Sequence, residues 1–334
     1  MQYVHTAYDQ LVGVNVAIKT PKAGQAGTRF KKSAIVAAKV NSHYVAKTLD
    51  YVEVSANERY LVEELVEGST LKESVLAVAG YVDPHLAARL LSKLAKGLAA
   101  SHHAQVIHRD LKPSNIMVRG GFNLLDVKIT DFGIATLTDE LFVEELANGR
   151  DLTQSTSGTV KGALPYMAPE MMFRKRGDTV GMAADVWSLG ALIFEAVTGQ
   201  YAFGEGLFAP ANVMAGKIAP WPPFMTSNPQ FAPLAEALQN IILECLQLDP
   251  SKRPTADDLA ARCIELCYFT GERHEGVVQN IAHVYGFIQG AGGKTFFHPK
   301  NVYGNNAART GTKVVFCRTA GSPYPRAFPM IAAK

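Results

Sequence analysis

The hydrophobic pattern of the first 66 residues is mostly that of β-strands. Residues 3–19 read as two short β-runs around a turn at Gly13, and residues 45–66 return to strand-like patterns. Between them, residues 28–40 carry apolar side chains at helical spacing. This part of the chain therefore predicts a small, β-rich layer with one helix.

The next two hundred residues have a helical pattern. Residues 85–103 place leucines four positions apart, which is typical of a helix with one apolar face. Residues 183–198 are almost entirely apolar and predict a buried helix, and residues 234–246 and 255–266 predict two more. A small β-rich lobe followed by a large helical lobe is an α+β arrangement.

The composition changes again after residue 268, where glycines and short β-runs replace the helical pattern. We place a domain boundary at residues 269–274. Residues 271–334 carry eight Lys and Arg against two acidic residues, while the whole chain has a net charge of +3, so the rest carries about −3. A basic final module on an acidic body indicates a polyanionic partner for that module.

The sequence shows neither a membrane segment nor a metal-binding pattern of cysteines. It has no run of 18 apolar residues, and its first ten residues, MQYVHTAYDQ, contain no apolar signal region. Its four cysteines lack metal-site spacing, and we interpret them as buried thiols. We therefore expect a cytoplasmic protein with no membrane partner.

The strongest chemical signal lies in residues 106–118, which read VIHRDLKPSNIMV. Phosphoryl transfer to a hydroxyl needs a carboxylate to orient the proton, a cation to balance charge, and oxygen ligands for magnesium. Asp110, Lys112 and Asn115 offer these groups within six residues. Asp131 follows in the run KITDFGIA, where a strand-like stretch ends in a glycine turn, and it would add a metal carboxylate.

In this order, about 20 residues apart, these motifs resemble the catalytic core of the eukaryotic-like protein kinase superfamily, including its bacterial serine/threonine branch. The resemblance covers about residues 1–268. It implies a bilobal kinase fold with a small N-lobe at 1–66 and a helical C-lobe at 67–268. It also implies transfer of the γ-phosphoryl group of ATP, with Mg²⁺, to serine and threonine hydroxyls of a protein substrate.

The resemblance implies a role for each residue of the motifs. Asp110 corresponds to the catalytic base, and Lys112 to the lysine that contacts the γ-phosphate in serine/threonine kinases. Asn115 and Asp131 correspond to the two magnesium ligands. Lys19, in the run VAIK, is similar to the strand lysine that pairs with the α- and β-phosphates.

The same resemblance implies an adenine site. Its lining would be formed by Val4, Ala17, Met117 and the hinge residues Glu64, Leu65 and Val66. Glu63 falls at the gatekeeper position beside the hinge, where a charged residue is unusual. The other interpretation of Glu63 is a solvated strand residue.

Three further residues resemble structural positions of the family. Glu170 lies in the run APE that ends the activation segment, and Arg253 resembles its buried ion-pair partner. Because an unpaired buried charge is costly, these two should be needed together. Asp185, in the run DVWSLG, resembles the aspartate that braces the catalytic loop.

The chain departs from the family pattern at three places. No glycine precedes Val4, so the predicted N-lobe lacks the glycine-rich strand whose backbone binds the phosphates in this family. Ser33 stands where the family has a helix glutamate, and no Asp or Glu occurs between Lys19 and Asp50. Ala163 stands where the family usually has a threonine.

These departures leave two hypotheses for the kinase-like part. In the first, the chain is a working kinase, because the base, the metal ligands and Lys19 are all present. In the second, it is a pseudokinase scaffold or nucleotide sensor. The polar run at 153–159 suggests autophosphorylation, after which Arg109 would bind the added phosphate group. The other interpretation of this run is a disordered polar loop.

Residues 275–334 resemble a cold-shock domain, a small OB-type β-barrel. The runs YGFI at 285–288 and FFH at 296–298 resemble its two RNA-binding motifs. The resemblance implies a face on which single-stranded RNA or DNA stacks and through which nucleic acid regulates the kinase. Its contact residues would be Tyr285, Phe287, Phe297 and His298. Alternatively, the rings are barrel core, or the face binds protein, including the kinase lobes.

Overall fold

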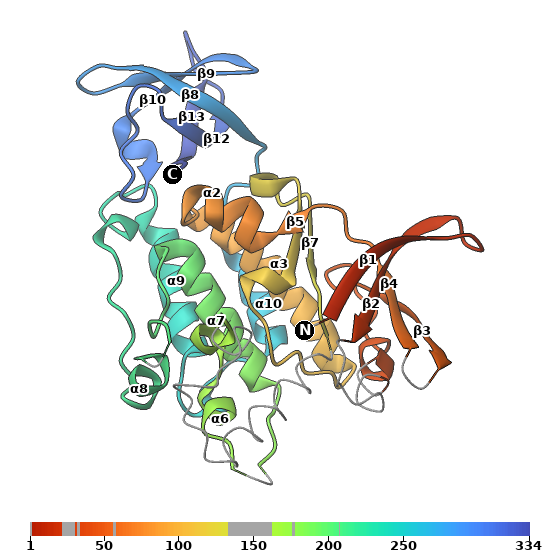
Figure 1. The fold of residues 1–334 in the computed structure, drawn as a ribbon. Helices are drawn as coiled ribbons and strands as arrows, with labels where there is room; N and C mark the ends of the chain where they lie inside the picture. The colour runs from red at the N-terminus through yellow and green to blue at the C-terminus, as the bar shows by residue number, and fades with distance from the viewer. Residues whose placement is uncertain are drawn as a thin grey trace.

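The computed structural model describes residues 2–21, 31, 34–55, 58–132, 162–175, 178–206 and 208–334. A β-sheet, a helical lobe and a final β-barrel follow one another along the chain (Figure 1). The barrel sits on the helical lobe, away from the first sheet (Figure 1). The polar run at 153–159, Ser33 and Gly133 lie outside the described residues, as do residues 28–30 and 32 of the helix predicted at 28–40.

The first sheet consists of antiparallel strands in the order β1-β2-β4-β3. The strands are β1 Gln2–Asp9, β2 Val14–Pro21, β3 Thr48–Ser55 and β4 Glu58–Glu64. Gly13, with φ +75°, forms the predicted turn between β1 and β2. Residues 34–37 are helical.

The register of β2 against β4 determines which of their side chains share a face of the sheet. Ala17 on β2 pairs with Glu63 on β4, and Lys19 pairs with Leu61. Directly opposite residues, and residues two apart on one strand, share a face of a sheet. All four side chains therefore lie on one face, and all four are buried.

The helical lobe contains each of the helices that the sequence predicts there, within about two residues at each end. Its helices are α2 Ala77–Ala79, α3 Pro84–His103, α6 Pro169–Met172, α7 Ala183–Thr198, α8 Phe208–Met214, α9 Ala232–Cys245 and α10 Ala256–Glu265. Nearly every residue of α7 is buried, as its apolar sequence predicts. No helix among the described residues combines the length and apolarity needed to cross a bilayer.

A small antiparallel sheet in the same lobe carries the catalytic motifs. It consists of β5 Ser69–Thr70, β6 Ile116–Arg119 and β7 Asp126–Ile129. A short 3₁₀ turn, Pro113–Asn115, precedes β6, and Asp131 follows β7. The β6–β7 hairpin thus brings the two motifs together.

The last sixty residues form a closed barrel of strands. These are β8 Arg273–Ile281, β9 Gly286–Gly290, β10 Gly293–Phe297, β11 Val302–Tyr303, β12 Lys313–Thr319 and β13 Arg326–Ala332. The order is β10-β9-β8-β12-β13, and parallel pairing of β10 with β13 closes the ring. Its interior holds Val278, Ile288, Phe297, Phe316 and Met330. The all-β final module that the sequence predicts is therefore present.

The barrel and the helical lobe share a hydrophobic core. Tyr303, Val315 and Ile331 of the barrel belong to the same buried cluster as α3, α7 and α9. The Tyr303 hydroxyl donates to the backbone oxygen of Val197 at 3.0 Å. The two parts of the chain are thus packed against each other as one body.

Candidate active site

A cavity of about 240 Å³ lies between the first sheet and the β6–β7 hairpin. Its lining includes every residue predicted to hold adenine: Val4, Ala17, Met117, Glu64, Leu65 and Val66. Lys19 and Asp131 also line it. Of the residues predicted to bind the nucleotide, the structure thus brings all except Asn115 to the lining of one cavity.

Asp185 holds the loop that carries the catalytic motif. Its carboxylate is fully buried at the start of α7 and accepts hydrogen bonds from the backbone N–H groups of His108 (2.8 Å) and Arg109 (2.7 Å). It also contacts Nε2 of His102 at 2.9 Å. Arg109 has a φ of +64°, a strained conformation for a residue with a side chain, and these bonds hold it there.

His108 ties this loop to the strand before Asp131. Its Nε2 lies 2.8 Å from the backbone oxygen of Thr130, so Nε2 must carry a proton. Its Nδ1 accepts from the backbone N–H of Asp110 at 3.2 Å. The bonds require the neutral Nε2–H tautomer. The ring also packs edge-on against Phe132, with centroids 4.5 Å apart.

The carboxylate of Asp110 is held in place by hydrogen bonds from two side chains of the same loop. Lys112 Nζ lies 2.9 and 2.7 Å from its two oxygens, and Asn115 Nδ2 donates to one of them at 3.0 Å. Asn115 Nδ2 also donates to the backbone oxygen of Asp110 at 2.8 Å. Charge-assisted bonds of this kind fix orientation as well as charge. Because the Asn115 nitrogen is committed to Asp110, its Oδ1 is the atom left for a metal.

Lys19 forms a buried cluster with two carboxylates. Its Nζ lies 2.7 Å from Asp131 Oδ1 and 2.5 Å from Glu63 Oε2. Glu63 is only 4% exposed, which corrects its interpretation as a solvated strand residue. The partner of Lys19 that the sequence does not supply from residues 20–49 is therefore on strand β4.

The charges in this cluster are interdependent. Burial lowers the pKa of Lys19, but the Asp131 and Glu63 carboxylates outweigh it and raise that pKa. Burial also raises the pKa of Glu63, and Lys19 only partly offsets this. For Asp131 the charge of Lys19 prevails over burial, and its pKa is lowered. Of the two carboxyls, Glu63 is thus the one that takes up a proton more readily.

The oxygens near Asp131 fit magnesium. Magnesium is usually held by one or two carboxylates together with substrate phosphates. Asp131 offers a carboxylate and Asn115 an amide oxygen. The part of the chain that the structure describes holds no cluster of three or more His, Cys, Asp or Glu side chains suited to a metal. The donor set therefore fits an ion shared with phosphates.

The predicted pair of Glu170 and Arg253 is formed. Arg253 donates from Nη1 to one oxygen of Glu170 at 2.7 Å and from Nη2 to the other at 2.9 Å. The guanidinium also donates to the backbone oxygens of Gln247 and Ala183, and it lies over the ring of Trp187. The pair thus ties the start of α6 to the loop before α10.

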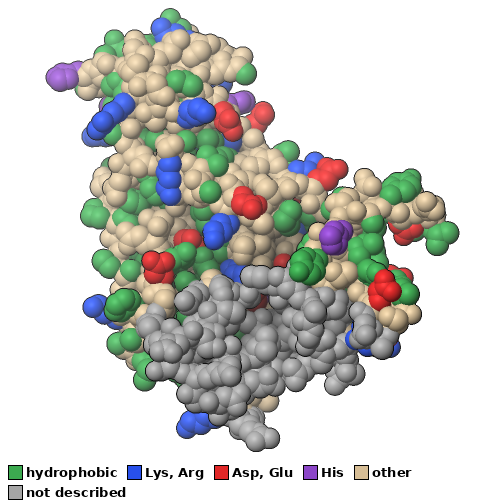
Figure 2. All heavy atoms as spheres, in the orientation of Figure 1, with side chains coloured by type: hydrophobic (Ala, Val, Ile, Leu, Met, Phe, Trp, Pro, Cys, Tyr) green, Lys and Arg blue, Asp and Glu red, His purple; other side chains and the backbone are tan. Residues whose placement is uncertain are grey.

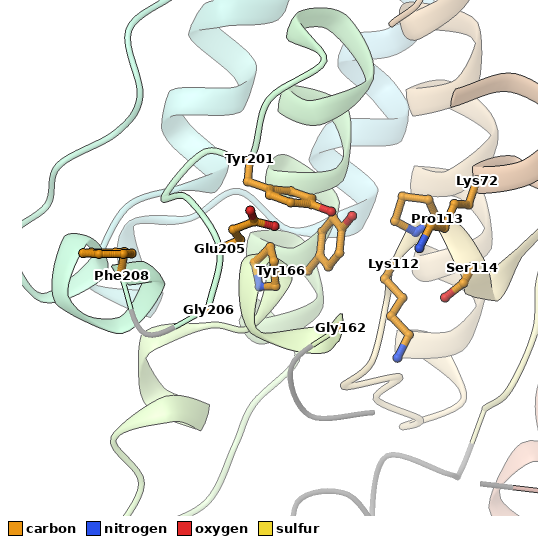
Figure 3. Close-up of a pocket in the computed structure, with 11 residues that line it drawn as sticks. Lys72, Lys112, Pro113, Ser114, Gly162, Tyr166, Tyr201, Glu205, Gly206 and Phe208 are labelled. Atoms are coloured by element: carbon orange, nitrogen blue, oxygen red, sulfur yellow. The ribbon is translucent and has the colours of Figure 1, made fainter. Parts of the chain in front are cut away.

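A larger pocket, of about 630 Å³, adjoins the catalytic loop. Lys112 and Ser114 line one side, and Tyr166, Tyr201 and Glu205 line the other (Figure 3). An extended segment that entered this pocket would pass beside Lys112, which contacts Asp110.

The barrel carries a cluster of aromatic rings at its surface, which we call the exposed aromatic cluster and define as Tyr285, Phe287, Phe296 and Tyr324. Tyr285 and Tyr324 are exposed, and Phe287 and Phe296 are half-buried. Tyr285 stacks on Phe296, and Lys294 Nζ lies 4.1 Å from the ring centre of Phe287. Phe296 lies in the run FFH that resembles the second RNA-binding motif, but it was not among the predicted contact residues. The sequence did not single out Tyr324 or Lys294. Further Lys and Arg side chains lie on the barrel and the adjoining helical lobe (Figure 2).

Two of the four contact residues predicted for the barrel are not in this cluster. Phe297 is fully buried in the barrel interior, so it cannot stack with a base, and the neighbouring Phe296 faces outward instead. His298 caps a short 3₁₀ turn by accepting from the backbone N–H of Lys300 at 3.1 Å. The exposed cluster retains Tyr285 and Phe287 from the prediction.

The protein kinase domain model matches residues 2–263 of the chain. The serine/threonine-protein kinase PrkC of Bacillus subtilis is 30% identical over 267 residues, which cover 78% of this chain and 38% of PrkC. PknB of Mycolicibacterium smegmatis is 30% identical over 286 residues, which cover 83% of this chain and 41% of PknB. The chain thus spans less than half the length of these curated relatives.

The fold also matches a solved structure, the crystal structure of Rad53 1-466 in complex with AMP-PNP. The TM-score is 0.57 at 22% sequence identity, and the match covers 78% of this chain and 60% of that one. This likeness concerns the fold.

Proposed function

The chain belongs to the protein kinase family, and we propose that it transfers the γ-phosphoryl group of ATP to serine or threonine hydroxyls of a protein substrate. We assign residues 1–66 to the N-lobe, 67–268 to the C-lobe and 275–334 to the barrel. The observation that carries the proposal is the arrangement of Asp110, Lys112 and Asn115 beside the cavity that Lys19 and Asp131 line.

Each side chain has a chemical task in this reaction. Asp110, held by Lys112 and Asn115, orients the acceptor hydroxyl and takes its proton. Lys112 balances charge on the transferred group, and Lys19 binds the nonreacting phosphates. Asp131 and Asn115 would hold magnesium, which when bound neutralises phosphate charge.

The two cavities suit the two substrates. Adenine would lie in the smaller one, between Ala17 and Met117, with its edge against the backbone of Glu64–Val66. The acceptor segment would lie in the larger pocket beside Lys112. The serine/threonine specificity of the named relatives supports a hydroxyl of that kind as acceptor.

The test of this proposal is phosphate transfer from labelled ATP with magnesium, measured for the wild type and for Asp110→Asn. Loss of the catalytic base should lower the rate about a hundredfold or more. Nucleotide affinity should change little, because Asp110 does not line the adenine cavity. Equal rates for the two proteins would contradict the kinase function and favour a pseudokinase scaffold.

A second function is favoured by the exposed aromatic cluster of the barrel. We assign the barrel to the OB type, and the parallel pairing of β10 with β13 and the pairing of β8 with both β9 and β12 support this assignment. Such barrels bind single-stranded nucleic acid by stacking bases on exposed rings beside basic side chains. Phe287, Phe296 and Lys294 offer this combination. We propose that this face binds single-stranded RNA or DNA.

A fluorescence titration with single-stranded oligonucleotides tests the second function. Stacking contributes about 1–3 kcal/mol per base, so Phe287→Ala with Phe296→Ala should weaken binding at least tenfold. Binding should also weaken as salt rises. Phe173→Ala, an exposed ring on the helical lobe, is the control. Affinity unchanged in the double variant would exclude this face as the binding surface.

A further inference from the structure

Lys19 has no acidic partner in the segment where its family has one. The sequence contains no Asp or Glu from residue 20 to residue 49. A buried lysine without a carboxylate tends to lose its proton or its fixed position, because burial disfavours the charged form. Something else must therefore hold Lys19 at the phosphate end of the cavity.

The sheet register supplies Glu63 for this purpose. Glu63 lies opposite Ala17, two residues from Lys19 on the same strand, so both side chains lie on the face that lines the cavity. The Lys19 Nζ to Glu63 Oε2 distance is 2.5 Å, and both side chains are almost fully buried. Neighbouring Glu64 points elsewhere, toward Lys128. The contact is therefore specific to one position of β4.

Asp131 alone does not suffice as the partner. It contacts Lys19 at 2.7 Å, but it is also the carboxylate proposed for magnesium. A lysine ammonium has three donors, so Lys19 can keep Glu63 and still bind a phosphate oxygen. Among the residues that the structure describes, Glu63 forms its ion pair with Lys19 alone, and we assign it no ligand. It is thus the partner that remains when the Asp131 oxygens are engaged elsewhere.

We propose that Glu63 is the positioning residue for Lys19, replacing from strand β4 the glutamate that a helix would otherwise supply. This inference rests on the proposed kinase function. Because β4 is hydrogen-bonded to β2, the lysine and its partner belong to one sheet. The position of Lys19 then does not depend on an acidic side chain in residues 20–49.

The test compares Glu63→Gln with Glu58→Gln in the full chain. Glu58 lies on the same strand, is exposed and accepts a hydrogen bond from the Tyr60 hydroxyl. Glu63→Gln keeps the shape of the side chain and removes its charge. We expect its kcat/KM for ATP to fall about 10- to 100-fold, the usual effect of losing a hydrogen bond to a charged group. Glu58→Gln should match the wild type.

A second measurement probes the contact between Lys19 and Glu63 independently of kinase activity. NMR of lysine labelled with ¹³C at Cε gives a signal for Lys19, which is identified by its loss in Lys19→Arg. Because the Glu63 carboxylate lies 2.5 Å from Lys19 Nζ, this signal should shift in Glu63→Gln and stay unchanged in Glu58→Gln. Thermal melting of both variants shows whether the fold is retained.

The outcomes separate this inference from the kinase function. If the wild type phosphorylates and Glu63→Gln is equally active with an unchanged Lys19 signal, the positioning role is wrong while the kinase function stands. If the wild type is no more active than Asp110→Asn, the kinase function fails. The inference then stands only if Glu63→Gln both shifts the Lys19 signal and lowers the affinity for magnesium-ATP.

Discussion

In the loop of residues 106–118, the conformation depends most on single residues that have several hydrogen-bond partners, and Asp185 is the main example. Asp185 uses two oxygens to satisfy the backbone N–H groups of His108 and Arg109 and the ring of His102. An asparagine at this position keeps one acceptor and presents a donor to one of these donors. A buried donor left unsatisfied costs about 1–3 kcal/mol.

We therefore expect Asp185→Asn to lower kcat at least tenfold, because one of the buried donors that fix the strained backbone around Arg109 loses its acceptor. The free energy of unfolding should fall by about 1–3 kcal/mol. Both are measured by steady-state kinetics and urea denaturation.

Asp257→Asn is a matched control for this change. Asp257 contacts His103 at the same 2.9 Å as Asp185 contacts His102, but that pair is exposed. Exposed pairs contribute at most about 1 kcal/mol. Similar losses in the two variants would show that burial of Asp185 does not determine its effect.

At this scale the sequence indicated the contacts among the proposed catalytic residues because these residues are neighbours in the chain. Asp110, Lys112 and Asn115 lie within one short loop, so their mutual contacts follow from local spacing. The pairing of Lys19 with Glu63 does not, because it depends on how β2 and β4 align. A charged residue on a strand reads as solvated until that register is known.

In the barrel, the alternation of side chains along each strand determines which of them face the interior. Phe296 and Phe297 are adjacent on β10, so they lie on opposite faces, one outward and one in the interior. Two adjacent aromatics look alike in sequence, and only the register shows which is buried. The long helices had no such ambiguity, since the leucine spacing fixes the buried face of α3, and the almost entirely apolar sequence of α7 predicts burial on all sides.

The buried Phe297 requires a glycine on the neighbouring strand. Gly286 pairs with Phe297, and a Cβ at Gly286 would lie within 2.6 Å of two ring atoms of Phe297. We expect Gly286→Ala to lower the free energy of unfolding by about 1–3 kcal/mol, as overpacking does. Calorimetry or denaturant titration measures this.

Gly181→Ala is the control, because a Cβ there would have no heavy atom within 4 Å. It should change stability by less than about 0.5 kcal/mol. A Gly286→Ala protein as stable as the wild type would mean that the Phe297 ring moves without cost, against the tight packing of the barrel.

For the whole molecule, the main departure from the sequence picture is how closely the barrel joins the helical lobe. The change of composition after residue 268 suggested a separate module, and β8 does begin at Arg273. However, Arg273 forms a buried ion pair with Asp83, 190 positions away, at 2.6 Å. Contacts over such separations leave no local pattern in the sequence.

Asp83 joins three parts of the structure. It caps α3 by accepting from the backbone N–H groups of His85 and Leu86, and it binds both Nη atoms of Arg273. Arg273 in turn exchanges backbone hydrogen bonds with the side chain of Asn123. Removing one partner of a buried pair costs about 3–5 kcal/mol.

The pH dependence of stability follows from the same pair. Burial by itself would raise the pKa of Asp83, but Arg273 outweighs it and holds that pKa below the ordinary 3.8. A carboxyl with a lowered folded-state pKa stabilises the fold above its unfolded pKa. That contribution is lost as the pH falls below about 4 toward the lowered value.

We therefore expect Asp83→Asn to lower the free energy of unfolding at pH 7 by about 3–5 kcal/mol and to lose part of the acid sensitivity of the wild type. Calorimetry from pH 7 to pH 3 measures both. The wild type should unfold in one transition, since barrel and lobe share a core. Glu244→Gln, which breaks an exposed pair with Arg262, should cost at most about 1 kcal/mol. Two separate transitions in the wild type would show that the barrel folds independently, and the buried pair would then not couple the two parts.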